Sequence, residues 1–319
     1  MKSFETGFET KSENGKNVEV MLVYLRHGHR GLSGDLTDLG RDETAEIARE
    51  LNLGEQYDMV KPYGSKAGPL KKIETESVVG EKELNMGRSM ETSLIFAQNS
   101  LAPGQEMYNP KPIDSVNYEK YKSTRPYDHI AIYNSFIPSD YNDLPDEKKV
   151  MAAKYAQKKT IEHLMSLNSA EAQEYKKEVA GGYALPLVHF AKMSERLKSN
   201  QKILAPLGAH GGHLELLLQQ AMVRNDSRGN RIVGFENLDE IGGEIDPSEG
   251  FSVQIKRDEN GKLQDYVLTF FNQEKRPAGE FVLDASKIRE VSEFYEELHR
   301  EDLSLLNNME VKKKENEEK

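Results

Sequence analysis

The sequence contains no cysteine, and this absence excludes several kinds of chemistry at once. Without cysteine the chain has no disulfides, no thiolate nucleophile and no cysteine-based zinc site. A cysteine-free chain fits a reducing compartment, and we expect this protein to be cytoplasmic.

Long apolar runs are also absent. No apolar stretch approaches the roughly 20 residues that a membrane-spanning helix needs. Residues 1–17 are polar and mixed in charge, without the apolar centre of a signal peptide, and we interpret them as a flexible leader. We therefore expect no membrane association.

An excess of positive charge is the third absence. The chain has 43 Lys and Arg against 54 Asp and Glu, which gives a formal net charge of -11. Sequence-independent binding of nucleic acid needs clustered cations, so nucleic acid is not an expected partner. A small anionic substrate would have to find its cations in one local pocket.

Strand and helix patterns alternate along much of the chain. Nearly continuous apolar runs at 18–25 and 203–208 are each followed by a loop and then by a helical pattern, at 37–51 and 214–223. This alternation favours an α/β fold, and we expect a three-layer sandwich with a mostly parallel central sheet. Residues 64–87 are expected to form a long loop with one short helix.

The middle of the chain differs in composition. Residues 99–199 open with a loop rich in proline and tyrosine and continue with two helical patterns rich in Lys and Glu. At about 150 residues per domain, 319 residues allow one large domain with an insertion. We interpret 99–199 as a mainly helical cap, inserted into an α/β core of residues 18–98 and 200–307. Residues 308–319 form a charged tail, and the Lys/Glu helices leave a homo-oligomer open.

Two loops follow the two apolar strands, at the place where open α/β sheets bind ligands. The first, residues 26–30, carries two arginines and two histidines around Gly28, and the second carries His210 beside a glycine pair that opens a helix. Arginine matches the geometry of phosphate oxygens, and backbone N–H groups at a helix N-terminus favour anions. The pattern predicts a phosphate pocket in which a neutral imidazole can attack phosphorus.

These motifs resemble a known family. Leu25–Arg30 is similar to the RHGxR signature of the histidine phosphatase superfamily, which includes the phosphoglycerate mutases. Leu36–Gly40 resembles the LTxxG that follows it, and Ala209–Gly212 resembles the motif around the second histidine. The three motifs occur in the order of the family.

The resemblance implies a phosphatase that hydrolyses a small phosphate monoester without metal or cofactor. His27 would become a phosphohistidine, while Arg26, Arg30 and His210 hold the phosphoryl oxygens. Two alternatives stay open. One is a phosphotransferase like the phosphoglycerate mutases, and the other is a catalytically weak protein that binds a phosphoryl ligand.

The family also places a further arginine at the start of a helix, in a pattern like RAxET. Arg88–Thr92 fits this pattern, and Lys71 within Ser65–Thr75 has the same spacing. We prefer Arg88, because lysine lacks the two-pronged fork of donors.

The general acid is less defined by the sequence. The family uses a Glu or Asp whose position varies among its branches. We select Glu249, in a glycine-rich loop before a strand, and Glu106 and Asp114 remain alternatives.

The remaining histidines and tyrosines are given structural roles. His29 and His213 lie beside the two motif histidines and could complete an all-histidine metal site, but the two flanking arginines would repel a dication. We interpret both as bystanders. Tyr118, with its neighbouring tyrosines, is interpreted as an aromatic anchor of a surface loop rather than as part of a substrate entrance.

Overall fold

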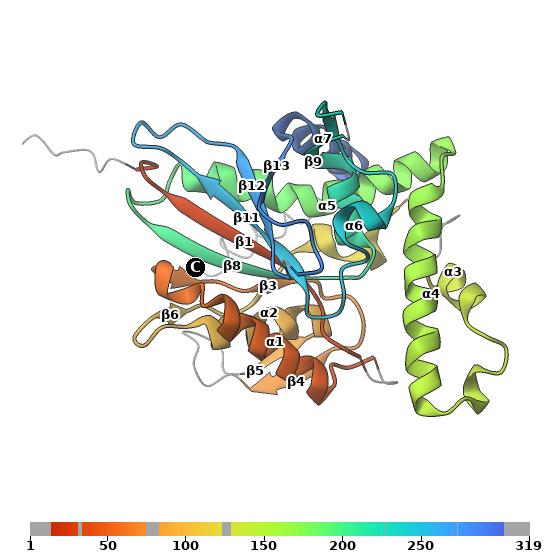
Figure 1. The fold of residues 1–319 in the computed structure, drawn as a ribbon. Coiled ribbons are helices and arrows are strands. Elements are labelled where there is room, and N and C mark those ends of the chain that lie inside the picture. Colours follow the sequence, from red (N-terminus) through yellow and green to blue (C-terminus); the bar gives the residue numbers. More distant parts are fainter. Residues whose placement is uncertain are drawn as a thin grey trace, which may run out of the picture.

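The computed structural model describes residues 14–30, 34–74, 83–122, 129–226, 228–272 and 274–302. Its helices are α1 (Asp38–Leu51), α2 (Arg88–Ser100), α3 (His129–Phe136), α4 (Asp146–Ser166), α5 (Ala170–Ser194), α6 (His213–Ala221) and α7 (Ala285–Leu298). Its strands are β1 (Glu19–Arg26), β2 (Met59–Val60), β3 (Tyr63–Gly64), β4 (Lys71–Glu74), β5 (Glu83–Met86), β6 (Glu106–Met107), β7 (Lys111–Pro112), β8 (Lys202–Ala209), β9 (Met222–Asn225), β10 (Arg231–Val233), β11 (Gly250–Lys256), β12 (Tyr266–Phe270) and β13 (Glu280–Leu283). Figure 1 shows their arrangement.

The large sheet is mixed, with a parallel half and an antiparallel half. Its strands lie in the order β10-β9-β13-β12-β11-β1-β8-β2-β6. β8 pairs in parallel with both β1 and β2, whereas β1, β11, β12 and β13 pair with one another in antiparallel succession. The expected α/β sandwich is confirmed, and its parallel pairing is confined to the half that contains β8.

Helices cover both faces of this sheet, with α5, α6 and α7 on one side and α1 and α2 on the other (Figure 1). The alternation of side chains along β1 explains both layers. Val20, Leu22 and Tyr24 pack into the cluster with α5, α6 and α7. Val23 and Leu25 pack into the cluster with α1 and α2. A strand buried on both faces must be almost wholly apolar, as the sequence of β1 is.

The expected insertion divides into two parts. α3 and α4 pack against each other and stand to one side of the sandwich (Figure 1). α5 instead packs against β1, α6 and α7, with Val179, Tyr183 and Leu187 fully buried. We therefore propose that the cap ends before residue 170 and that α5 belongs to the core. The expected tail, and the leader up to residue 13, lie outside the described residues. Among the described residues, no helix is long and apolar enough to cross a membrane.

Candidate active site

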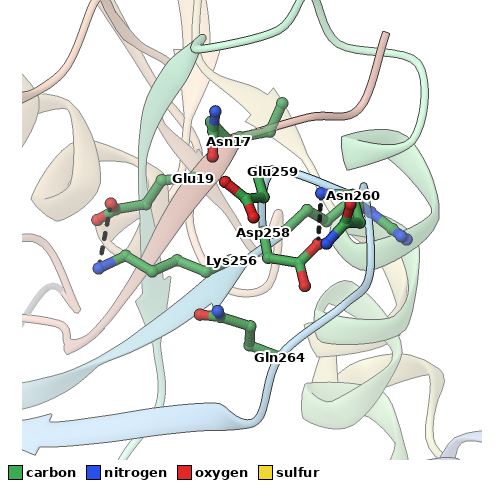
Figure 2. A pocket seen from close by; sticks show the side chains of 9 residues that line it. Asn17, Glu19, Lys256, Asp258, Glu259, Asn260 and Gln264 are labelled. Carbon is green, nitrogen blue, oxygen red and sulfur yellow. Dashed lines mark hydrogen bonds and ion pairs between the residues drawn. The ribbon is translucent and has the colours of Figure 1, made fainter.

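A surface hollow of about 440 Å³ lies at the amino-terminal end of β1 (Figure 2). Its charged groups are mixed in sign, and Lys256 lies 3.5 Å from Glu19 across the sheet. The basic loop begins at the other end of β1, at Arg26, which is about 25 Å away at 3.3 Å per residue. The site that the motifs predict therefore lies at the carboxyl end of β1, on the edge of the sheet opposite to this hollow.

The two motif loops meet at that opposite edge. β1 and β8 are parallel neighbours, with Arg26 in register with Ala209. The backbone N–H of His27 donates to the carbonyl of Ala209 over 2.9 Å. The imidazole rings of His27 and His210 consequently lie with their centroids 5.5 Å apart, and both side chains are buried.

The proton on His27 is fixed by its neighbour in the chain. Nδ1 of His27 lies 2.9 Å from the carbonyl oxygen of Gly28. A carbonyl only accepts, so in this contact Nδ1 carries the proton and the lone pair of the neutral ring is on Nε2. Burial lowers the pKa of His27 well below its usual value, and the nearby Arg88, Arg26 and Arg30 lower it further, against the opposing contact with Gly28. The ring is thus neutral near pH 7, with Nε2 able to act as a nucleophile.

The arginines around His27 repel one another. Burial lowers the pKa of Arg88, and the positive charge of Arg30 lowers it further. Arg26 is buried and donates from Nη1 to the carbonyl of Ile245 over 2.5 Å, while its Nε has no partner among the described residues. Positive charges gathered in this way favour an anion between them.

The helix that carries Arg88 is tied to the first loop through the residues that follow it in the motif. Ser89 donates to the carbonyl of Gly208 over 2.7 Å. Glu91 forms an ion pair of 2.8 Å with Arg41 of α1, and Thr92 accepts from the backbone N–H of Gly28 over 3.3 Å. The competing Lys71 forms an ion pair of 2.8 Å with Asp35. The geometry thus favours Arg88 as the third phosphate cation.

The second motif holds the first loop against α1. Thr37 caps α1 by accepting from the N–H of Gly40, and its hydroxyl donates to the carbonyl of His29 over 3.0 Å. A Cβ on Gly40 would lie 2.5 Å from the backbone nitrogen of His29, and one on Gly28 would lie 2.6 Å from the carbonyl oxygen of Gly40. The two motif glycines therefore permit a contact between backbones that no side chain would allow.

Tyr118 lies beside His210 in the candidate site, whereas we expected it to anchor a surface loop. Its ring contacts that of His210 edge-on, with centroids 4.8 Å apart, and its hydroxyl raises the pKa of Arg88, against the effect of burial. A tyrosine-rich loop after α2 was the only signal in the sequence. The loop is brought to the pocket by the close packing of neighbouring Ser115 on Gly182 of α5, where Ser115 donates to the Gly182 carbonyl over 2.7 Å.

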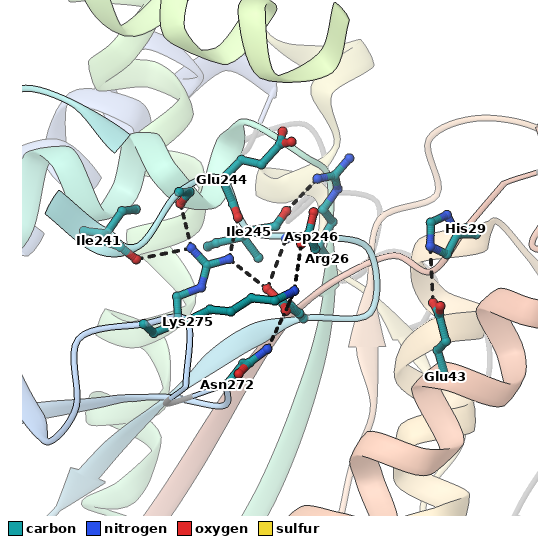
Figure 3. Close-up of polar contacts among 12 residues, drawn as sticks. Arg26, His29, Glu43, Ile241, Glu244, Ile245, Asp246, Asn272 and Lys275 are labelled. Carbon is teal, nitrogen blue, oxygen red and sulfur yellow. Dashed lines mark hydrogen bonds and ion pairs between the residues drawn. The ribbon is translucent and has the colours of Figure 1, made fainter. Parts of the chain in front are cut away.

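The structure does not favour Glu249 as a proton donor. Its carboxylate forms an ion pair of 2.7 Å with Arg276 and accepts from Asn272 over 3.0 Å (Figure 3). Burial alone would raise the pKa of Glu249, but the hydrogen bonds from Arg276 and Asn272 hold it below the usual value. Asp114 pairs with Lys120 over 2.9 Å, and the side chain of Glu106 lies outside what the structure describes.

The two extra histidines do not join the motif histidines in a metal cluster. His29 lies 3.4 Å from Glu43 of α1 (Figure 3), and His213 lies among aromatic rings beside Tyr183. Within the described part of the chain, no group of three or more His, Asp or Glu side chains is arranged to hold a metal ion.

Comparisons with known proteins give matches in structure alone. No protein-family model matches the sequence, and no curated protein matches it significantly. A mycobacterial glucosyl-3-phosphoglycerate phosphatase aligns over 80% of this chain and 99% of its own, at 12% identity and a TM-score of 0.39. A phytase from Klebsiella aligns over 88% and 96%, at 11% identity and a TM-score of 0.37. A phosphoserine phosphatase from Entamoeba histolytica aligns over 62% and 77%, at 15% identity and a TM-score of 0.24.

All three TM-scores are below 0.5, so these likenesses carry no argument about activity. The resemblance to the histidine phosphatase superfamily rests on the three ordered motifs and on the cluster of histidines and arginines that they bring together around His27.

Proposed function

We propose that this protein is a phosphatase that hydrolyses a small phosphate monoester through a phosphohistidine on His27. The observation that carries the proposal is the state of His27. Its ring is neutral, its lone pair is on Nε2, and it is buried near Arg88, Arg26 and Arg30. A nucleophile held among fixed cations suits a phosphoryl group and few other substrates.

The reaction has two displacements at phosphorus. Nε2 of His27 attacks the phosphorus in line, the N–P bond forms, and the ester P–O bond breaks as the leaving oxygen takes up a proton. Water then attacks the phosphohistidine, the N–P bond breaks, and inorganic phosphate leaves. The arginines and His210 stabilise the charge on the phosphoryl oxygens in both steps. Neither step uses a metal or a cofactor.

The test is a hydrolysis assay on a panel of phosphate monoesters with and without a chelator. We expect the wild type to be active with chelator present and His27→Ala to lose at least about 10³-fold in kcat. His29→Ala is the matched control, since this neighbouring side chain faces Glu43, and it should keep its activity. The wild type quenched during turnover should gain the mass of one phosphoryl group, labile to acid, that His27→Ala lacks.

The outcomes separate the alternatives. Stimulation by a diphosphorylated ester together with slow hydrolysis would favour a phosphotransferase. Binding of inorganic phosphate without turnover of any ester would favour a phosphoryl-binding protein. Full activity in His27→Ala, or loss of activity with chelator, would contradict the proposal.

A further inference from the structure

Another acidic residue lies near Arg26, in the same loop as Glu249. Glu244 is half-buried, and its Oε2 has no hydrogen-bond partner among the described residues. The next residue, Ile245, accepts from the guanidinium of Arg26, and in Figure 3 the side chains of Glu244 and Arg26 extend to the same side of the loop. The charge of Arg26 also acts on the Glu244 carboxyl group, and in the proposed reaction Arg26 binds the phosphoryl group.

The charges around Glu244 come from four elements. Burial raises its pKa to about 7, against the positive charge of Arg26. Glu215 of α6 and Asp246 of the same loop raise it further, and Lys158 of α4 lowers it. Glu215 is itself fully buried and accepts from the N–H of Ile245 over 2.9 Å. A carboxyl group in this setting carries a proton for part of the time at neutral pH.

Glu244 and Glu249 occupy opposite environments within a few residues of each other. Arg276 forms an ion pair with the side chain of Glu249. Its contact with Glu244 is instead with the backbone, since it donates to the carbonyl of Glu244. Within the described ranges, no cation forms a hydrogen bond with the carboxyl group of Glu244, whereas that of Glu249 is held in its charged form. A proton donor needs an environment like that of Glu244, in which the carboxyl group can keep its proton.

We propose that Glu244 is the general acid that protonates the leaving oxygen when His27 is phosphorylated. This inference rests on the proposed function. As the P–O bond breaks, the carboxyl O–H of Glu244 transfers its proton to the departing oxygen, giving a neutral alcohol and a carboxylate. In-line attack by His27 puts the leaving oxygen on the side of the phosphorus opposite to the histidine. The general acid must therefore reach the phosphoryl group from that opposite side.

The test measures phosphohistidine formation in a single turnover, with two substrates. An alkyl phosphate leaves as a strongly basic alkoxide and needs a proton, whereas 4-nitrophenyl phosphate leaves as a stable phenolate. Glu244→Gln should form phosphohistidine from the alkyl ester about 10²–10⁴-fold more slowly. It should form phosphohistidine from 4-nitrophenyl phosphate at nearly the wild-type rate. Asp239→Asn removes an exposed carboxylate from the helical turn five residues before Glu244 and should match the wild type with both esters.

The pH profile gives a second readout. With the alkyl ester, the wild type should lose rate as pH rises through about 7, because Glu244 loses its proton. Lys158→Ala should move this basic limb to higher pH, since Lys158 lowers the pKa of Glu244. A merely structural role for Lys158 would not move the limb.

The two proposals fail in different ways. If the wild type forms no phosphohistidine from any ester, the proposed function is wrong. If it does form one, and Glu244→Gln matches the wild type or slows both esters equally, the function stands and Glu244 is not the acid.

Discussion

The burial of His27 lowers the pH at which its ring is protonated and loses its reactivity, compared with an exposed histidine. Burial and the three arginines favour the neutral ring in the folded protein. The ordinary pKa of histidine is about 6.5, so the nucleophile stays available at pH values where an exposed imidazole would be protonated.

For 4-nitrophenyl phosphate, whose leaving group needs no proton, we therefore expect kcat/KM to remain constant as pH falls through about 6.5 and to decline only at lower pH, because protonated His27 cannot attack phosphorus. The same shift affects stability. Below about 6.5 the unfolded chain gains a proton on His27 that the folded chain does not, so the free energy of unfolding decreases as pH falls. Urea unfolding across pH measures this decrease, which His27→Gln should reduce and His29→Gln should not.

Either Arg88 or Lys71 could be the third phosphate cation, and one pair of variants separates the two assignments. Arg88→Ala removes a cation from beside His27, and kcat/KM should fall about 10–150-fold, the value of a charged hydrogen bond. The acid limb of its pH profile should also move to higher pH, since Arg88 lowers the pKa of His27. Lys71→Ala breaks only the ion pair with Asp35 and should keep its activity. Loss in Lys71→Ala with normal activity in Arg88→Ala would reverse our assignment.

Residues inside motifs could be placed from the sequence, because each motif fixes both the residue type and its position at a strand end. His27 and His210 lie together because β1 and β8 are neighbours in register, as their buried apolar sequences favour. Glu244 and Tyr118 could not be found in this way. Their proposed roles depend on burial and on neighbours that are distant in the chain. The spacing of residues in the sequence gives no information about either.

The start of α1 provides a test in which helix propensity and packing predict opposite signs. Gly40 is the third residue of α1, and replacing a helical glycine by alanine ordinarily stabilises by about 1 kcal/mol. Here the new Cβ would lie 2.5 Å from the backbone nitrogen of His29, which cannot rotate away. Gly40→Ala should instead destabilise by about 1–3 kcal/mol and reduce activity by displacing the loop.

Thermal and urea unfolding measure this effect, with Glu46→Ala on the exposed side of α1 as the control. A stabilised and fully active Gly40→Ala would show that the loop does not need its contact with α1.

The long helices and central strands were predictable, and the exceptions have physical reasons. The first turn of α5 is polar, but its middle is buried, and two glycines there let other parts of the backbone pack closely against it. A Cβ on Gly181 would lie 2.2 Å from the carbonyl of Val291 in α7. Residues 64–87 were expected to form a long loop with one short helix, but β4 and β5 within this range pair as antiparallel strands, and residues 75–82 between them lie outside the described part of the chain. Strands of three or four residues such as β9, β10 and β13 are too short for their alternation to stand out.

Across the whole molecule, a buried polar contact joins three segments that are distant in the sequence. Glu178 of α5 is fully buried and accepts from His299, just after α7, over 2.7 Å. It also accepts from the backbone N–H of Lys122 over 2.5 Å. Lys122 follows the loop that carries Tyr118 to the pocket, so this contact connects the core helices with the edge of the candidate active site.

His299→Ala should therefore lower the free energy of unfolding by about 3 kcal/mol, because it leaves the Glu178 carboxylate buried with one partner fewer. His189→Ala is the matched control, since this exposed histidine lies 3.9 Å from Glu296 and its loss should cost less than about 0.5 kcal/mol. Urea unfolding measures both. Because the loop of Tyr118 is tied to the same carboxylate, KM for the ester should rise in His299→Ala, while a phosphohistidine should still form. Equal stability of the two variants would mean that the last turn of α7 does not hold this loop in place.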